Sequence, residues 1–431
     1  MTQISRTPFM WAEFDKDGKP TDPQFFQNYL KFLGDKTDIF IVSHGWQTGI
    51  DGAWNGYSSL WAELEGKIAG PGKSWGVVGV SWPSAKYRKE TDRLQSPQIT
   101  GEGGQVASTG QGSNIRDLTE EELDEQVLVF AKFVDTDAGK LLTAIKAMDR
   151  DGINMASAAA VLEAVDAAVR FSKPGDDELS SDVKPLLSAN PAGLFFSAQA
   201  PVRYGGGGGG QVAGIGGTVK KWLAGPRAGI ANILEFTTYW EMKKRAGKVG
   251  AALGPLLLQP HLGKATRFHL VGHSFGGRLV TAAVSALVPG SKVASLVLMQ
   301  AAFSHNGLTA GFKPGKNGAF CNVVTDARAN RIAITHTHND LANAIAYPIA
   351  SRLSQDITTD FGGINDEYGA MGANGARKLP ESIHDRVVSN KNGTTEFGAK
   401  LVTSVDCTNH VGDHNDVWTV EMAALLGSAI K

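Results

Sequence analysis

The sequence predicts an α/β fold: a doubly wound, mostly parallel sheet that carries a large helical, loop-rich insertion. Short apolar and β-branched runs end in polar or glycine residues, as strands buried on both faces of a parallel sheet do. Stretches with helical spacing separate most of these runs, and this alternation implies right-handed crossovers. Residues 91–229 interrupt the alternation over a length far beyond that of ordinary loops.

The expected elements follow one another along the chain on either side of this interruption. The predicted strands are Asp38–Val42, Val77–Trp82, Phe268–Val271, Val293–Met299, Arg331–Thr335 and Leu401–Val405. The predicted helices are Trp54–Ile68, Thr238–Leu253, Gly277–Leu287, Leu341–Leu353 and the final run Val417–Ala429. We therefore expect residues 1–90 and 230–431 to form one core, whose chemistry collects at the carboxyl ends of the strands.

The insertion, residues 91–229, combines flexible and helical patterns. Its polar start, Gln95–Ser113, and the glycine run Gly205–Gly210 are typical of loops. Between them, Thr119 stands three residues before Glu122, a capping-box pattern that begins a helical run through Met148. A second helical run covers Ile153–Val169. This pattern predicts a helical lid.

Composition and charge limit the classes of partner. The 42 Lys and Arg residues nearly balance the 43 Asp and Glu residues. The chain therefore lacks the excess positive charge that favours binding to nucleic acid or to an anionic membrane. Met1–Pro8 lacks the apolar core of a secretory leader, and the apolar run Leu279–Phe303 is interrupted at Pro289. We expect a cytoplasmic protein without stable membrane insertion, although export without a leader stays open. Whether Cys321 and Cys407 pair is also open.

A candidate nucleophile lies in the middle of the predicted core. Residues 268–277 read Phe-His-Leu-Val-Gly-His-Ser-Phe-Gly-Gly, a strand that runs into a helix. A serine on such a sharp turn needs small residues two positions before and after it, and Gly272 and Gly276 satisfy this. The turn exposes the Ser274 hydroxyl near the positive end of the following helix, between His273 and Phe275. The pattern favours a nucleophile elbow over an ordinary tight turn.

With this elbow, residues 1–90 and 230–431 resemble the α/β-hydrolase superfamily, and in particular its serine esterases and lipases. In that family a strand ending in His-Gly precedes the oxyanion loop, and here Ile39–Val42 leads to Ser43-His44-Gly45-Trp46. The resemblance implies that the backbone N–H groups of Trp46 and Phe275 form an oxyanion hole. Two such donors, fixed before reaction, stabilise a developing alkoxide without reorganisation.

The family order of nucleophile, acid and base implies that Asp340 and His414 complete a catalytic triad with Ser274. A serine hydroxyl needs an imidazole to take its proton and a carboxylate to hold that imidazole. Asp340 could instead cap a following helix, and His410 competes with His414. His414 is favoured because it follows Gly412 and enters the last helical run.

The spacing His336-x-His338-x-Asp340 also matches the start of a dimetal motif, but Leu341 follows where a histidine ligand would be needed. We therefore expect neither a metal nor an organic cofactor. The predicted function is hydrolysis of a small-molecule or lipid carboxylic ester through a Ser274 acyl-enzyme. The alternatives are thioesterase, amidase or acyltransferase chemistry, a toxin-like lipase exported without a leader, or a non-catalytic binding or scaffold protein on the same fold.

Overall fold

The computed structural model describes residues 2–46, 48–84, 117–134, 136–169, 192, 226–263, 265–340 and 369–430. The chain divides into two compact units. The first comprises Met1–Ala85, Met242–Ile349 and Ile357–Lys431, and the second comprises Lys86–Glu241 with Ala350–Asp356. The sequence placed the limits of the insertion at residues 91 and 229.

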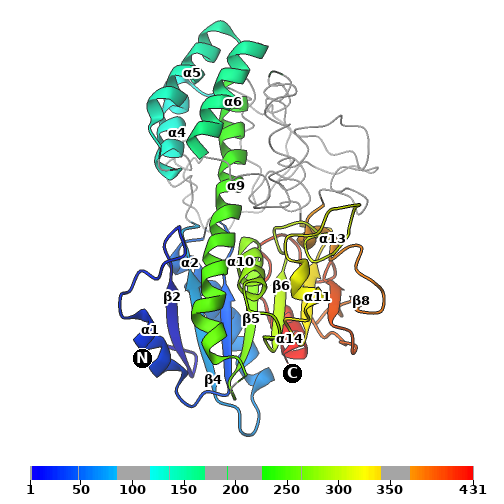
Figure 1. Ribbon diagram of the computed structural model, residues 1–431. Helices are drawn as coiled ribbons and strands as arrows, with labels where there is room; N and C mark the ends of the chain where they lie inside the picture. Colours follow the sequence, from blue (N-terminus) through cyan, green and yellow to red (C-terminus); the bar gives the residue numbers. More distant parts are fainter. Residues whose placement is uncertain are drawn as a thin grey trace, which may run out of the picture. The chain divides into compact units, whose positions relative to one another are not determined.

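The first unit is built on a sheet whose described strands run in the order β1-β2-β4-β3-β5-β6-β7-β9-β8 (Figure 1). All neighbouring strands pair in parallel except β1 with β2. The expectation of an α/β fold with a mostly parallel sheet is therefore confirmed. The strands are β1 Thr2–Ile4, β2 Thr7–Glu13, β3 Asp38–Ser43, β4 Trp75–Ser81, β5 Arg267–His273, β6 Ser295–Met299, β7 Ile332–His336, β8 His384–Val388 and β9 Val402–Asp406.

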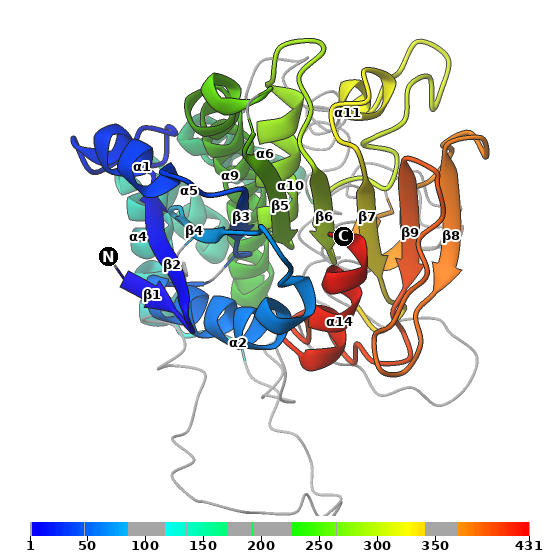
Figure 2. The same cartoon turned by 90° about the horizontal axis from the view of Figure 1, so that it is seen from below.

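Helices cover both faces of this sheet (Figure 2). α2 (Ile50–Ile68) and α14 (Val420–Ala429) pack together on one face, where their apolar side chains meet those of the strands. α1 (Phe25–Leu33) and α10 (Phe275–Ser285) lie on the other face. β3 is buried along its whole length, as expected of a central strand covered on both sides.

The long helix α9 (Pro226–Leu253) packs its C-terminal end against α10. A Cβ on Gly250 would overlap the carbonyl of Leu279, and one on Gly254 would overlap the carbonyl of Ala283. The end of α9 and the start of η1 (Gly254–Leu258), which follows it, can approach α10 this closely only because both positions are glycine. The remaining short elements are η2 Gln259–His261, α11 Cys321–Thr325 and α13 Met371–Asn374.

The second unit contains helices with their own apolar core. The capping box of Thr119 and Glu122 is confirmed at the start of α4 (Glu120–Phe133). The single helical run expected through Met148 is two helices, because the Asp137 side chain accepts a hydrogen bond from the Gly139 N–H and starts α5 (Ala138–Asp151) afresh. α6 covers Met155–Val169.

Three strands were missing from the prediction: β1, β2 and β8. β8 reads His-Asp-Arg-Val-Val, whose charges fit an edge strand and hide the usual apolar signal. The loops expected at residues 95–113 and 205–210, and the helix expected at 341–353, lie outside the described residues. In the part of the chain that is described, no helix has both the length and the apolar character needed to cross a membrane.

Candidate active site

Ser274 lies on a strained turn between β5 and α10. Its backbone has φ 56° and ψ −123°, a conformation that non-glycine residues adopt only when their surroundings impose it. Two hydrogen bonds, one to the end of β6 and one to the segment after it, impose it here. The Ser274 N–H donates to the Met299 carbonyl at 3.0 Å, and the Ser274 carbonyl accepts from the Ala302 N–H at 3.1 Å.

The glycines of the elbow permit the close approach of backbone to backbone. A Cβ on Gly272 would overlap the backbone of Gly276. A Cβ on Gly276 would lie 2.5 Å from the His44 carbonyl oxygen and closer still to that of Ser43. The elbow therefore contacts the end of β3, where the expected oxyanion loop begins.

The structure brings the three predicted triad side chains together at the carboxyl edge of the sheet. The His414 Nε2 atom lies 2.8 Å from the Ser274 Oγ atom, and the His414 Nδ1 atom lies 2.9 Å from Asp340 Oδ2. The competing histidine is placed elsewhere, since His410 Nε2 lies 3.0 Å from Ser389 Oγ. These three residues follow β5, β7 and β9, which are parallel and end at one edge.

The groups around His414 raise the pKa of its imidazole, so the ring accepts a proton more readily than a free imidazole does. Burial alone would lower its pKa, but the charge of Asp340 and its hydrogen bond outweigh this effect. The net pKa of His414 therefore lies above the ordinary value of imidazole. Asp340 itself is completely buried, so its charge acts on the imidazole with little screening by solvent.

His273, the residue before the candidate nucleophile, holds the backbone of the candidate base. Its burial lowers its pKa to about 3, so the ring is neutral at physiological pH. Because a carbonyl can only accept, His273 Nε2–H donates to the His414 carbonyl oxygen at 2.7 Å. The centroids of the Trp418 and His273 rings lie 5.7 Å apart with the rings nearly perpendicular, and Trp418 in turn packs on Gly56 of α2.

The loop after β3 is fixed by buried polar groups. His44 has a pKa lowered to about 4 by burial, and its Nδ1–H donates to the Gly45 carbonyl at 2.9 Å. Trp82 Nε1–H donates to the His44 carbonyl at 3.1 Å. The Gly45 carbonyl and the Trp46 N–H belong to one trans peptide, so fixing the first directs the second to the opposite side. The expected oxyanion donor is thus oriented by His44.

The residues of the alternative metal motif do not gather around a common point. Asp340 faces His414, whereas His338 Nε2 lies 3.9 Å from Asp406 Oδ2. Across the described ranges, no group of three or more His, Cys, Asp or Glu side chains is arranged to hold a metal ion. Cys321 and Cys407 are both free thiols.

A second serine, histidine and aspartate series lies at the opposite edge of the sheet, and sequence patterns gave no sign of it. His269 Nδ1 lies 2.9 Å from Ser295 Oγ, and His269 Nε2 lies 3.0 Å from Asp38 Oδ1. All three residues are at most 2% exposed and none has the strained backbone of Ser274. This series links the amino ends of β3, β5 and β6 inside the protein, with no access for a substrate.

Comparison of the chain with protein-family models, with curated proteins and with solved structures finds no match. What the site can do follows from its atoms. A hydroxyl beside a neutral imidazole, which is backed by a buried carboxylate, can lose its proton and attack an electrophilic carbonyl carbon. The holding roles of His44 and His273 were missed in the sequence, because each depends on contacts with distant strands or loops.

Proposed function

We propose that this protein is a serine hydrolase of the α/β-hydrolase type that cleaves carboxylic esters through an acyl-enzyme. The observation that carries the proposal is the continuous chain of hydrogen bonds from Ser274 Oγ through His414 to Asp340, at 2.8 Å and 2.9 Å. It starts from a serine held in a strained backbone conformation at the carboxyl edge of the sheet. The buried series of Ser295, His269 and Asp38 has similar hydrogen bonds but lacks this strained backbone.

In the first step, the Ser274 oxygen attacks the ester carbonyl carbon while its proton passes to His414 Nε2. The imidazole becomes positively charged, and Asp340 stabilises that charge without taking the proton. Asp340 also keeps the other proton on Nδ1, which leaves the Nε2 lone pair free for the serine proton. The raised pKa of His414 makes it a stronger base once it is deprotonated.

The carbonyl oxygen gains negative charge during this attack. The Trp46 and Phe275 N–H groups would stabilise that charge by donating hydrogen bonds to the oxygen. The first is oriented by His44, and the second lies at the start of α10. A Cβ on Gly45 would lie 2.8 Å from the Ser274 Cβ, so the loop passes directly beside the nucleophile. A missing donor of this kind costs about 10² to 10³ in kcat in other enzymes.

The leaving alcohol then receives its proton from His414, and the acyl group stays on Ser274. Water repeats the sequence in the second half: His414 takes a proton from water, the hydroxide attacks the acyl carbon, and Ser274 recovers its proton. Each half returns the imidazole to its neutral form, so the cycle balances.

The insertion at residues 91–229 would act as a lid that selects the acyl group. β4, the last described strand before it in the chain, is parallel to β3 and β5 and ends at the sheet edge that carries Ser274. Ser84, the last described residue before it, donates its hydroxyl proton to the Thr48 carbonyl at 2.9 Å and contacts His44 Nδ1 at 3.3 Å. Ser84 is therefore held beside the candidate oxyanion loop. Limited proteolysis with and without an acyl inhibitor tests the lid. If the insertion is a lid, the inhibitor should change the rate of cleavage within residues 91–229.

Labelling with a fluorophosphonate tests the proposed reaction. The wild-type protein should be labelled at one serine, and Ser274→Ala should abolish labelling while the protein stays folded. Ser389→Ala is the matched control, because that serine also contacts a histidine, His410, but has ordinary backbone geometry. Label on Ser389, or its persistence in folded Ser274→Ala, would overturn the assignment. A panel of p-nitrophenyl esters, with thioester and amide analogues, then defines the bond and chain length.

A further inference from the structure

The candidate acid and base lie on two loops that leave neighbouring strands. β7 and β9 pair in parallel with His336 opposite Asp406, so the loops that follow them start side by side. Asp340 lies at the end of the first loop and His414 lies on the second. Strand pairing fixes where these loops begin, but it does not fix the positions of side chains several residues further on.

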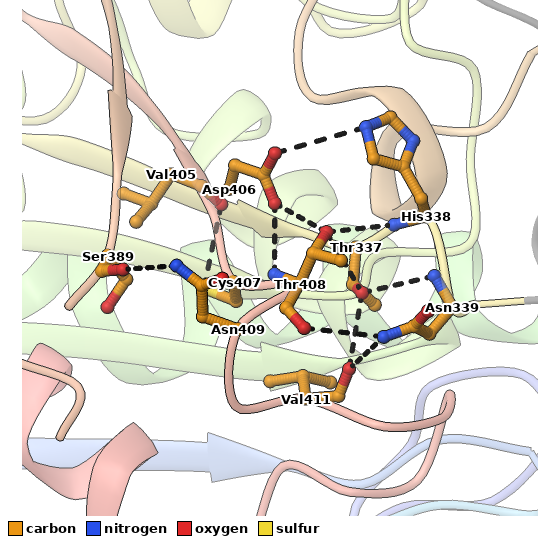
Figure 3. Close-up of polar contacts among 10 residues, drawn as sticks. All are labelled: Thr337, His338, Asn339, Ser389, Val405, Asp406, Cys407, Thr408, Asn409 and Val411. Carbon is orange, nitrogen blue, oxygen red and sulfur yellow. Dashed lines mark hydrogen bonds and ion pairs between the residues drawn. The ribbon is translucent and has the colours of Figure 1, made fainter. Parts of the chain in front are cut away.

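A group of polar contacts joins the two loops beyond the strand ends (Figure 3). The Asn339 side-chain amide donates to the Val411 carbonyl at 2.9 Å and to the Thr408 carbonyl at 3.4 Å. The Thr337 hydroxyl donates to the same Val411 carbonyl at 3.2 Å. The Asn339 N–H donates to that hydroxyl oxygen at 3.1 Å, which fixes the turn that carries Asn339.

The second half of this group is centred on Thr408. Its hydroxyl donates to Asp406 Oδ1 at 2.6 Å and accepts from the His338 N–H at 3.3 Å. The Thr408 N–H also donates to Asp406 Oδ1 at 2.9 Å. The base loop is thus anchored to the end of β9, and the acid loop is attached to that anchor.

From these contacts we propose that Asn339 is a positioning residue that holds the acid loop against the base loop and so sets the contact of Asp340 with His414. Asn339 is adjacent in the chain to Asp340, and its partner Val411 stands three residues before His414. The inference rests on the proposed function for its catalytic meaning. The contact between the two loops, and its effect on His414, can be measured without any substrate.

The consequence of loosening this contact follows from the groups that face His414. Asp340 and Asp413 raise the pKa of His414, and burial lowers it. His273 faces the ring as well but is neutral and does not titrate in the working range. If Asp340 moves away while the imidazole stays buried, the raising influence falls and the pKa of His414 decreases.

The test compares Asn339→Ala with Asn409→Ala in the full chain. Asn409 is the matched control, because it lies on the same loop as His414 but its amide donates to the Ser389 carbonyl at 3.3 Å and not to the acid loop (Figure 3). Proton–nitrogen NMR follows the titration of His414, and the acid limb of kcat/KM is measured in parallel. We expect Asn339→Ala to lower the pKa of His414 and the midpoint of the acid limb of kcat/KM, and to reduce kcat by about tenfold with KM nearly constant. Asn409→Ala should leave the pKa of His414, the acid-limb midpoint and kcat unchanged.

An unchanged His414 midpoint in folded Asn339→Ala would refute the positioning role, as would an equal shift in Asn409→Ala. Should Asn339→Ala fail to fold, Thr337→Val tests the same contact with a side chain of equal shape, and the same lowering is expected. The two proposals fail differently. A wild type that neither hydrolyses esters nor reacts with the fluorophosphonate contradicts the proposed function, while the NMR titration still decides whether Asn339 controls the contact of Asp340 with His414.

Discussion

A single methyl group on Gly276 should separate the candidate nucleophile from the oxyanion loop. A Cβ at this position would lie 2.5 Å from the His44 carbonyl oxygen, where ordinary contacts begin at 3.4 Å. The Ser43 carbonyl oxygen is closer still. Both obstacles are backbone atoms at the end of β3, so no side chain can rotate out of the way. The start of α10 must therefore move away from β3 by about 1 Å.

This displacement defines the expected magnitude for Gly276→Ala. A misplacement of about 1 Å in a catalytic arrangement costs on the order of 10² in rate, so kcat on any ester that the wild type cleaves should fall by about that factor. The free energy of unfolding should fall by about 1–3 kcal/mol, the usual cost of overpacking. Binding of substrate away from the reacting carbonyl is unaffected, so KM should change little.

Gly66→Ala provides the matched control. Gly66 lies in α2, and an added Cβ meets no atom within 4 Å. Because glycine disfavours a helix interior by about 1 kcal/mol relative to alanine, this variant should be slightly more stable than the wild type and equally active. Ester hydrolysis and thermal unfolding of both variants form the assay. Folded Gly276→Ala with wild-type kcat would refute the claim that close packing of the elbow on β3 sets the oxyanion site.

Other consequences of the site can be checked with the same assays. kcat/KM should rise with pH through a midpoint above the ordinary imidazole value of 6.5, because His414 must lose a proton that Asp340 helps it to hold. Asp340→Asn should lower kcat by about 10⁴ and move that midpoint to lower pH, and a midpoint that stays in place would contradict the assigned partner. His414→Ala should remove activity at pH 8 whereas His410→Ala keeps it, a comparison that fails if the two lose activity equally. His269→Leu should lower the free energy of unfolding, measured by denaturant titration, by about 3 kcal/mol, because buried Asp38 loses a hydrogen bond. The folded fraction of this variant should keep the wild-type kcat.

The sequence by itself determined the α/β class, the central strands and the position of the candidate nucleophile. These features are local: a buried strand is a short apolar run, and a serine elbow is a strand, two glycines and a helix in direct succession. Edge strand β8 escaped prediction because its exposed, charged residues lack that local signal. Asp340 and His414 were named through a family resemblance. Nothing near Asp340 distinguishes it from a helix cap, and only Gly412 and the following helical run favoured His414 over His410.

Only the tertiary structure decided which side chains meet. The strand order β5-β6-β7-β9 brings the loops that carry Ser274, Asp340 and His414 to one edge of the sheet. There the loop after β9 places His414 beside Ser274 while His410 turns toward Ser389. The neighbouring loops after β7 and β9 also bring Asn339 into contact with Val411. The fold also brings together the buried series of Asp38, His269 and Ser295, which no spacing in the sequence predicts. A hydrogen bond between distant loops depends on the register of several strands at once, and no local stretch of sequence carries that information.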